Sequence, residues 1–129
     1  MHVIQKKSCA LALALIATAV VPPAASAQSK FPERPLRLVV PFAPGGVNDI
    51  IGRRYAQDLS RVLGQNVVVE NKGGAAGAIG SSDVARAKPD GYSILIGNTT
   101  THVINQISKP DLSYHALKDF APIALVGGG

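Results

Sequence analysis

Residues 36–49 read Leu-Arg-Leu-Val-Val-Pro-Phe-Ala-Pro-Gly-Gly-Val-Asn-Asp, and this stretch decides the fold. The largely apolar residues 36–41 predict a buried strand. Residues 41–46 then form an elbow rich in proline and glycine, and Asn48 or Asp49 can cap the helix that follows. Such an elbow directs bare backbone N–H groups and the positive end of a helix at one place, which suits an anion such as a carboxylate.

The first 27 residues have the features of a cleaved signal peptide. Lys6 and Lys7 form a basic start, residues 9–21 are almost entirely apolar, and Ala25-Ser26-Ala27 is a typical cleavage site. The apolar run is shorter than the about 20 residues that a membrane-spanning helix needs. We therefore expect export and removal of residues 1–27, and an uncleaved membrane anchor is the alternative.

The composition excludes several classes of protein. The chain has 129 residues, with 13 Lys and Arg, 8 Asp and Glu, and one cysteine. The cysteine and two of the lysines lie within residues 1–27, so the remaining chain has no thiol chemistry and its formal net charge falls from +5 to +3. This positive excess is scattered and is not interleaved with aromatic residues, which argues against a nucleic-acid partner. The length suits one small domain with a modest core.

Strand and helix patterns alternate along the rest of the chain. Residues 66–70 and 93–97 predict two further strands, the first of them buried because it has three consecutive valines. An amphipathic helix that ends near Gly64 is predicted by an apolar residue at every fourth position, namely Ile51, Tyr55, Leu59 and Leu63. Shorter elements are expected as helices at residues 79–87 and 103–107 and a fourth strand at residues 122–126. This order predicts an α/β fold, with a parallel or mixed sheet and helices on both faces.

Polar, glycine-rich loops follow the first three predicted strands, at residues 41–48, 71–77 and 97–102. Because ligands of such sheets bind beyond the carboxyl ends of the strands, we expect these loops to form one binding edge. The run from Gly73 to Gly80 lacks the spacing and position of a dinucleotide fingerprint. We also find no set of residues with the context of a catalytic or metal site, so we expect no enzyme activity, no cofactor and no metal.

Five short motifs occur in a fixed order: Pro41-Phe42-Ala43-Pro44-Gly45-Gly46, Asn48-Asp49, Val68-Val69-Glu70-Asn71-Lys72-Gly73-Gly74, Lys88-Pro89-Asp90-Gly91-Tyr92 and Lys118-Asp119-Phe120-Ala121-Pro122-Ile123. This series resembles the extracytoplasmic substrate-binding receptors of the tripartite tricarboxylate transporter family, often called Bug receptors. The resemblance runs from about residue 31 to residue 126.

The resemblance implies a periplasmic-binding-protein-like fold of two α/β lobes that close on a small carboxylate and pass it to membrane permease subunits. Residues 28–129 would then be a partial N-terminal lobe, truncated before the second. The implied location is the periplasm. In the family, backbone groups of the elbow and polar loops nearby hold the carboxylate. Carried over to this chain, the site residues are Phe42, Ala43, Gly45, Gly46, Asn48, Asp49, Asn98, Thr99, Thr100, Thr101 and His102.

Several of these residues also have structural interpretations. Gly45 and Gly46 can simply allow a tight turn, and Asp49 can cap its own helix and orient the loop. His102 can be a helix cap or a surface residue, and Arg53 and Arg54 are expected on a solvated helix face. For the whole chain, the alternatives are a truncated, non-functional remnant of a receptor or an exported α/β enzyme.

Overall fold

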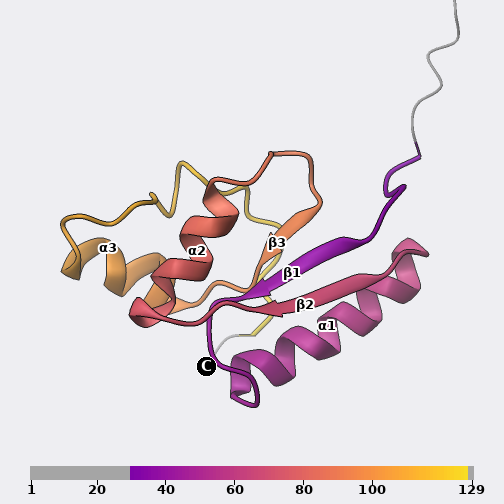
Figure 1. Ribbon diagram of the computed structural model, residues 1–129, viewed down its shortest axis with the longest axis horizontal. Coiled ribbons are helices and arrows are strands. Elements are labelled where there is room, and N and C mark those ends of the chain that lie inside the picture. The colour runs from indigo at the N-terminus through magenta and orange to yellow at the C-terminus, as the bar shows by residue number, and fades with distance from the viewer. Residues whose placement is uncertain (1–29, 128–129) are drawn as a thin grey trace, which may run out of the picture.

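The computed structural model describes residues 30–127 (Figure 1). The predicted signal peptide lies outside the described residues. The elements follow in the order β1 (Leu36–Val40), α1 (Val47–Leu63), β2 (Val67–Asn71), the 3₁₀ turn η1 (Ala75–Gly77), α2 (Ala78–Ala85), β3 (Ser93–Leu95), the π-helical turn η2 (Thr100–Ile104) and α3 (Asn105–Ser108).

The three strands form one parallel sheet with β1 in the middle, in the order β2-β1-β3. Leu38 of β1 is opposite Val69 of β2 and Ile94 of β3. Its neighbour Val39 is completely buried. A central parallel strand is covered on both faces, which is why β1 is almost continuously apolar. The predicted α/β fold with a parallel sheet is confirmed.

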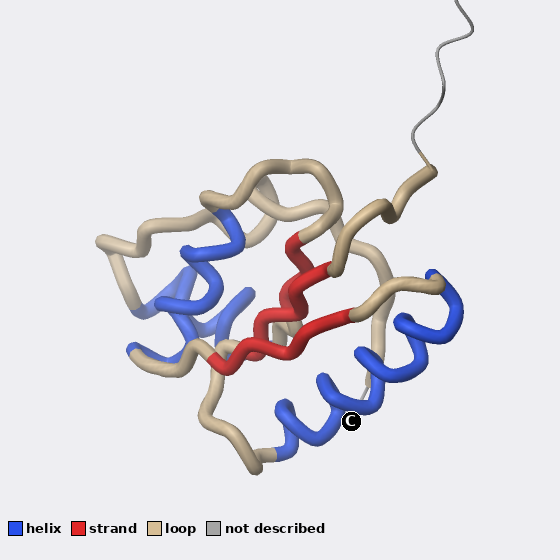
Figure 2. The backbone as a smooth tube through the Cα atoms, turned by 45° about the vertical axis from the view of Figure 1, so that its right-hand side comes forward, coloured by secondary structure: helices blue, strands red, loops and turns tan. Residues whose placement is uncertain are grey.

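The helices lie on both faces of this sheet, with α1 on one side and α2 on the other (Figure 2). On the α1 side, Leu38, Val40, Ala56 and Ile96 form the core. On the opposite side, Arg37 of β1 donates from Nη1 to Asp83 Oδ2 of α2 at 2.7 Å. Because side chains of a strand alternate between its two faces, β1 contributes to both layers.

The helix α1 packs through a different face from the predicted one. Its buried residues are Asp49, Gly52 and Ala56, whereas Ile51 and Tyr55 are only half-buried. Gly52 lies so close to the sheet that an added β-carbon would be 2.6 Å from Val40 Cγ2. Small side chains let the helix backbone approach the strands, so they define the packed face here in place of the larger apolar residues.

The start of α1 also differs from the prediction. The residue that caps the helix is Gly46, and it has an extended backbone and no side-chain capping bond. The prediction that Asn48 or Asp49 is the cap is therefore wrong. The carbonyl oxygen of Gly46 accepts hydrogen bonds from the N–H groups of Asp49 and Ile50, both at 3.0 Å.

The outer elements are less regular than predicted. Strand β2 is at an edge and only half-buried, with Val68 51% exposed, so the prediction of a fully buried second strand is wrong. Residues 122–126 form no strand, and Ile123 and Leu125 are exposed. This segment runs beside α1, where Tyr55 Oη donates to the carbonyl oxygen of Val126 at 2.9 Å. Without a neighbouring strand edge, an extended segment cannot form ladder hydrogen bonds.

The helical segment after β3 begins earlier than the predicted residues 103–107. The π-helical turn η2 starts at Thr100 and continues into α3, which ends at Ser108. Part of the run expected as a loop is therefore helical. Within residues 30–127, no helix has both the length and the apolar character needed to span a bilayer.

Candidate functional site

The three loops that follow the strands meet at one edge of the sheet. A β-carbon added to Gly77 would be 2.6 Å from Thr101 Cγ2 and 3.3 Å from Phe42 Cζ. A β-carbon added to Gly73 would be 3.4 Å from the backbone nitrogen of Ala43. Residues from the loops at 41–48, 71–77 and 97–102 are therefore in direct contact, as the alternating pattern predicted.

The elbow between β1 and α1 presents backbone donors. Among the described residues, the N–H groups of Phe42, Ala43 and Gly46 donate to no protein acceptor. Ala43 and Gly46 are exposed, and Gly46 immediately precedes the 17-residue helix α1. The N–H groups of a helix start and the positive end of its dipole favour an anion at this position. The elbow thus combines N–H groups that have no protein acceptor with the start of a long helix.

The buried side chain of Asp49 holds the elbow in place through hydrogen bonds. Its side chain is 4% exposed, and Oδ2 accepts hydrogen bonds from the Gly45 N–H at 2.8 Å and from Arg53 Nε at 3.0 Å. Oδ1 accepts from Asn71 Nδ2 at 2.9 Å. The bond from Gly45, followed by those from Arg53 and Asn71, lowers the pKa of Asp49 to about 2. Asp49 is therefore ionised and orients the loop, and it does not cap the helix.

Two residues of this arrangement were not identified as site residues from the sequence. Asn71, at the end of β2, donates from Nδ2 to the carbonyl oxygen of Phe42 at 3.2 Å as well as to Asp49. Its Oδ1 accepts from Arg53 Nη2 at 3.1 Å. The available signal was the position of Asn71 directly after a strand and within a motif of the family. Arg53 is half-exposed, but it is tied to the elbow and is not simply a solvated residue.

Asn98 and Thr101 bond to one another around the start of the third helical segment. The Asn98 N–H donates to Thr101 Oγ1 at 2.9 Å, and the Thr101 N–H donates to Asn98 Oδ1 at 3.1 Å. Thr101 is fully buried, and its hydroxyl also donates to the Asn98 carbonyl oxygen at 3.0 Å. Among the described residues, the hydroxyls of Thr99 and Thr100 have no protein partner. The structure thus gives Asn98 and Thr101 a role in shaping this loop and leaves the other two hydroxyls available.

His102 lies against the same loop. Its Nδ1 is 2.9 Å from Thr101 Oγ1, and its ring centroid is 5.1 Å from that of Phe120. The ring packs so tightly against Gly97 that a β-carbon could not be added there. Burial lowers the pKa of His102, which favours the neutral ring. The structure gives His102 a packing role, and this ring adds no fixed positive charge to the edge.

The middle loop is held by the third helical segment. Ala75 and Ala76 have positive φ angles of 48° and 58°. Asn105 Nδ2 donates to the Ala76 carbonyl oxygen at 2.9 Å, and Lys109 Nζ donates to the Ala75 carbonyl oxygen at 3.0 Å. These bonds fix an otherwise unfavourable left-handed turn. The glycine-rich run therefore lets the loop at residues 71–77 pass close to the elbow backbone.

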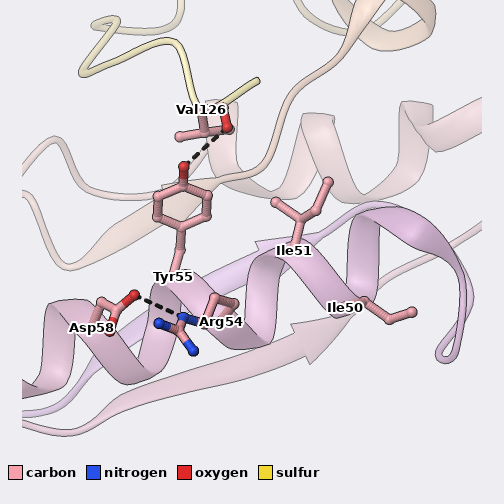
Figure 3. Close-up of a pocket in the computed structure, with 6 residues that line it drawn as sticks. All are labelled: Ile50, Ile51, Arg54, Tyr55, Asp58 and Val126. Carbon is pink, nitrogen blue, oxygen red and sulfur yellow. Dashed lines mark hydrogen bonds and ion pairs between the residues drawn. The ribbon is translucent and has the colours of Figure 1, made fainter. Parts of the chain in front are cut away.

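Two hollows of the described surface lie away from the elbow. One, of about 460 Å³, lies between the outer face of α1 and the C-terminal segment (Figure 3), and is lined by Ile50, Ile51, Arg54, Tyr55, Asp58 and Val126. The other, of about 380 Å³, is lined by Ala75, Ala78 and residues 108–113. Neither includes the elbow or residues 98–102. Residues 30–127 also contain no cluster of three or more His, Cys, Asp or Glu suited to a metal ion.

Comparison with known proteins assigns the family. The family model of the tripartite tricarboxylate transporter family receptor matches residues 51–128, which is more than half of the chain. The chain belongs to this receptor family. The family consists of solute-binding receptors and not of enzymes.

Relatives and solved structures of the family agree with this assignment. The chain is 39% identical to protein BugT of Bordetella pertussis over 113 residues, which is 87% of this chain and 34% of BugT. MatC of Rhodopseudomonas palustris, solved with bound malate, is 40% identical with a TM-score of 0.72, over 74% of this chain and 33% of MatC. A second R. palustris protein, solved with adipate, is 37% identical with a TM-score of 0.64, over 67% of this chain and 29% of that protein.

The extent of these matches defines what the chain represents. It spans about a third of the length of the curated relatives that it matches. A further structure, of a periplasmic transporter, is 52% identical with a TM-score of 0.67 over 68% of this chain. The predicted periplasmic-binding-protein-like fold is confirmed for this portion.

Proposed function

We propose that this chain is the carboxylate-capturing portion of an extracytoplasmic solute receptor. The observation that carries the proposal is the elbow, where Phe42, Ala43 and Gly46 present unpaired N–H groups at the start of α1. Each hydrogen bond to a charged group contributes about 1.5–3 kcal/mol. Several such donors converging on one carboxylate would hold it without a salt-bridging arginine.

The eleven predicted site residues divide into two roles under this proposal. Direct contacts would come from the N–H groups of Phe42, Ala43 and Gly46, from the Asn48 amide and from the free hydroxyls of Thr99 and Thr100, whereas the Gly45 N–H is already bonded to Asp49. Asp49, Asn98, Thr101 and His102 shape the loops, because their polar atoms already bond within the protein. This division follows from which atoms have partners in the structure.

The ligand class is supported by the relatives. MatC binds malate and the second R. palustris protein binds adipate, and both are small dicarboxylates. We propose a ligand of the same class for this chain. The mild positive charge of the chain would attract such an anion.

The setting of the protein follows from the same proposal. Residues 1–27 would act as a signal peptide, residues 28–129 would form part of the first lobe, and the protein would work in the periplasm. Its partners would be the membrane permease subunits of a tripartite transporter, and its task would be to bind a solute for transport and not to convert it.

Isothermal titration calorimetry of the purified exported protein tests this function. We expect heat of binding with malate or adipate and none with adipamide, the neutral diamide of adipate, because the elbow donors recognise a carboxylate. Equal binding of adipate and adipamide would contradict carboxylate recognition.

A further inference from the structure

A negative side chain lies directly behind the proposed anion site. Asp49 is in the first turn of α1, three residues after Gly46, and it is buried. An uncompensated carboxylate at this place would repel a ligand carboxylate. Its presence needs an explanation that the proposed function does not supply.

The contacts of Asp49 supply that explanation. Three donors reach its two oxygens, and one of them, Arg53, compensates its charge at 3.0 Å. The Gly45 N–H is drawn inward by this bond, at a residue whose φ is +83°. Both oxygens of the Asp49 carboxylate thus accept hydrogen bonds from the protein, and the N–H groups of Phe42, Ala43 and Gly46 do not bond to it.

Asn71 closes the arrangement. Its Nδ2 donates both to the carbonyl oxygen of Phe42, in the elbow, and to Oδ1 of Asp49, in the first turn of α1. Its Oδ1 accepts from the same Arg53 that pairs with Asp49. Strand β2, the elbow and the first two turns of α1 are therefore joined in a ring of hydrogen bonds.

We propose that Asp49, Arg53 and Asn71 form a positioning network that sets the direction of the free N–H groups of the elbow, and so determines how tightly it binds a carboxylate. The inference rests on the proposed function for its ligand, but its structural part does not. None of the three residues needs to touch the ligand. Amide groups aimed in advance bind more tightly than those that must be ordered on binding.

The same helix offers matched controls. Arg54 Nε pairs with Asp58 Oδ2 at 3.1 Å, with the same four-residue spacing as Asp49 and Arg53 but in the reverse order and on an exposed part of the helix, and neither residue bonds to the elbow. Asp58→Asn and Arg54→Gln therefore repeat the chemical changes of Asp49→Asn and Arg53→Gln away from the site. Arg53 is half-exposed, so Arg53→Gln removes two bonds of the network with little risk to folding.

NMR amide spectra and amide hydrogen exchange of the purified exported protein test the network without a ligand. We expect the amide of Gly45, which bonds to Asp49, to exchange faster in Asp49→Asn and Arg53→Gln, and the free amides of Ala43 and Gly46 to shift in their NMR spectra. All three amides should stay unchanged in the two controls. The amide of Val39, at the centre of the sheet, should stay protected in every variant and reports an intact fold. Unchanged elbow amides in both network variants would overturn the inference.

Calorimetry with malate and adipate then connects the network to binding. We expect Asp49→Asn and Arg53→Gln to raise the Kd by roughly tenfold or more, and the controls to leave it near the wild-type value. Network variants that keep full affinity despite altered elbow amides would also overturn the inference. If the wild type binds neither acid while the elbow amides respond as expected, the proposed function is refuted and the structural role of the network stands.

Discussion

Replacing Gly46 with proline is expected to weaken carboxylate binding by removing one donor from the elbow. Gly46 has a φ of −79°, close to the value that a proline ring fixes, so the backbone at this residue need not change direction. Its carbonyl oxygen, which accepts hydrogen bonds from Asp49 and Ile50, is retained. The change therefore removes the N–H group at the start of α1 and puts the ring Cδ in its place, so the lost hydrogen bond gives a lower limit for the effect.

The size of the effect follows from the strength of that bond. A hydrogen bond to a carboxylate contributes about 1.5–3 kcal/mol, which corresponds to a roughly 10- to 150-fold increase in Kd. The matched control is Gly46→Ala, which keeps the N–H group. Its β-carbon would have the Ala43 carbonyl oxygen as nearest neighbour, at an ordinary 3.7 Å.

Isothermal titration calorimetry with malate and adipate would measure both variants, and thermal unfolding would confirm that both are folded. We expect the alanine variant to bind like the wild type and the proline variant to bind much more weakly. If the two folded variants bind with equal affinity, the Gly46 N–H does not hold the ligand, and the role assigned to the elbow backbone is refuted.

Three further outcomes follow from the packing and the buried polar groups. Gly52→Ala should lower the free energy of unfolding by about 1–3 kcal/mol, because the added β-carbon would collide with Val40. Denaturant titration measures this loss, and an unchanged midpoint would contradict the close packing of α1. The depressed pKa of Asp49 predicts a stabilising contribution that is complete above about pH 4 and is lost as the pH falls toward about 2. The free energy of unfolding of Asp49→Asn, measured as the pH is lowered, should not show this loss between about pH 4 and about pH 2. A pH dependence equal to that of the wild type would contradict the role of Asp49. Thr101→Val should lower the free energy of unfolding by about 0.5–1.5 kcal/mol, because the part-buried N–H of Asn98 loses its acceptor. A measured stability equal to that of the wild type would show that the loop repacks.

The strongest local patterns predicted the layered architecture well. The two adjacent valines before Pro41 and the three before Glu70 gave the strands to within a residue or so, because a strand covered by helices must be apolar. The gathering of the loops at one edge followed from strand direction alone. These features depend on sequence that is adjacent in the chain.

Other features depend on distances between elements, and the sequence pattern did not reveal them. The face of α1 that packs on the sheet is set by how closely the helix approaches, which makes Gly52 and Ala56 the contact residues in place of the larger Ile51. Residues 122–126 have a strand-like composition, but composition does not supply a pairing partner. The second strand is apolar and yet half-exposed because it is at an edge of the sheet.

The candidate site shows the same division. The elbow and the polar run after β3 were recognisable, because both directly follow a predicted strand of a parallel sheet. The interactions of Asn71 and Arg53 were not, because each bonds to residues far away or on a neighbouring turn. The hydrogen bonds between Asn98 and Thr101 were also missed, since a polar run alone does not show which side chains bond to one another.

The position of Gly77 limits how this binding edge could change during evolution. Phe42, Thr101 and the carbonyl oxygen of Pro41 all lie within contact distance of a side chain that this residue lacks. A larger residue there would collide with Thr101 and crowd Phe42 and Pro41, at a positive φ angle that also favours glycine. New ligand preferences would therefore have to arise through outward-facing side chains such as Thr99, on a frame whose dimensions are fixed.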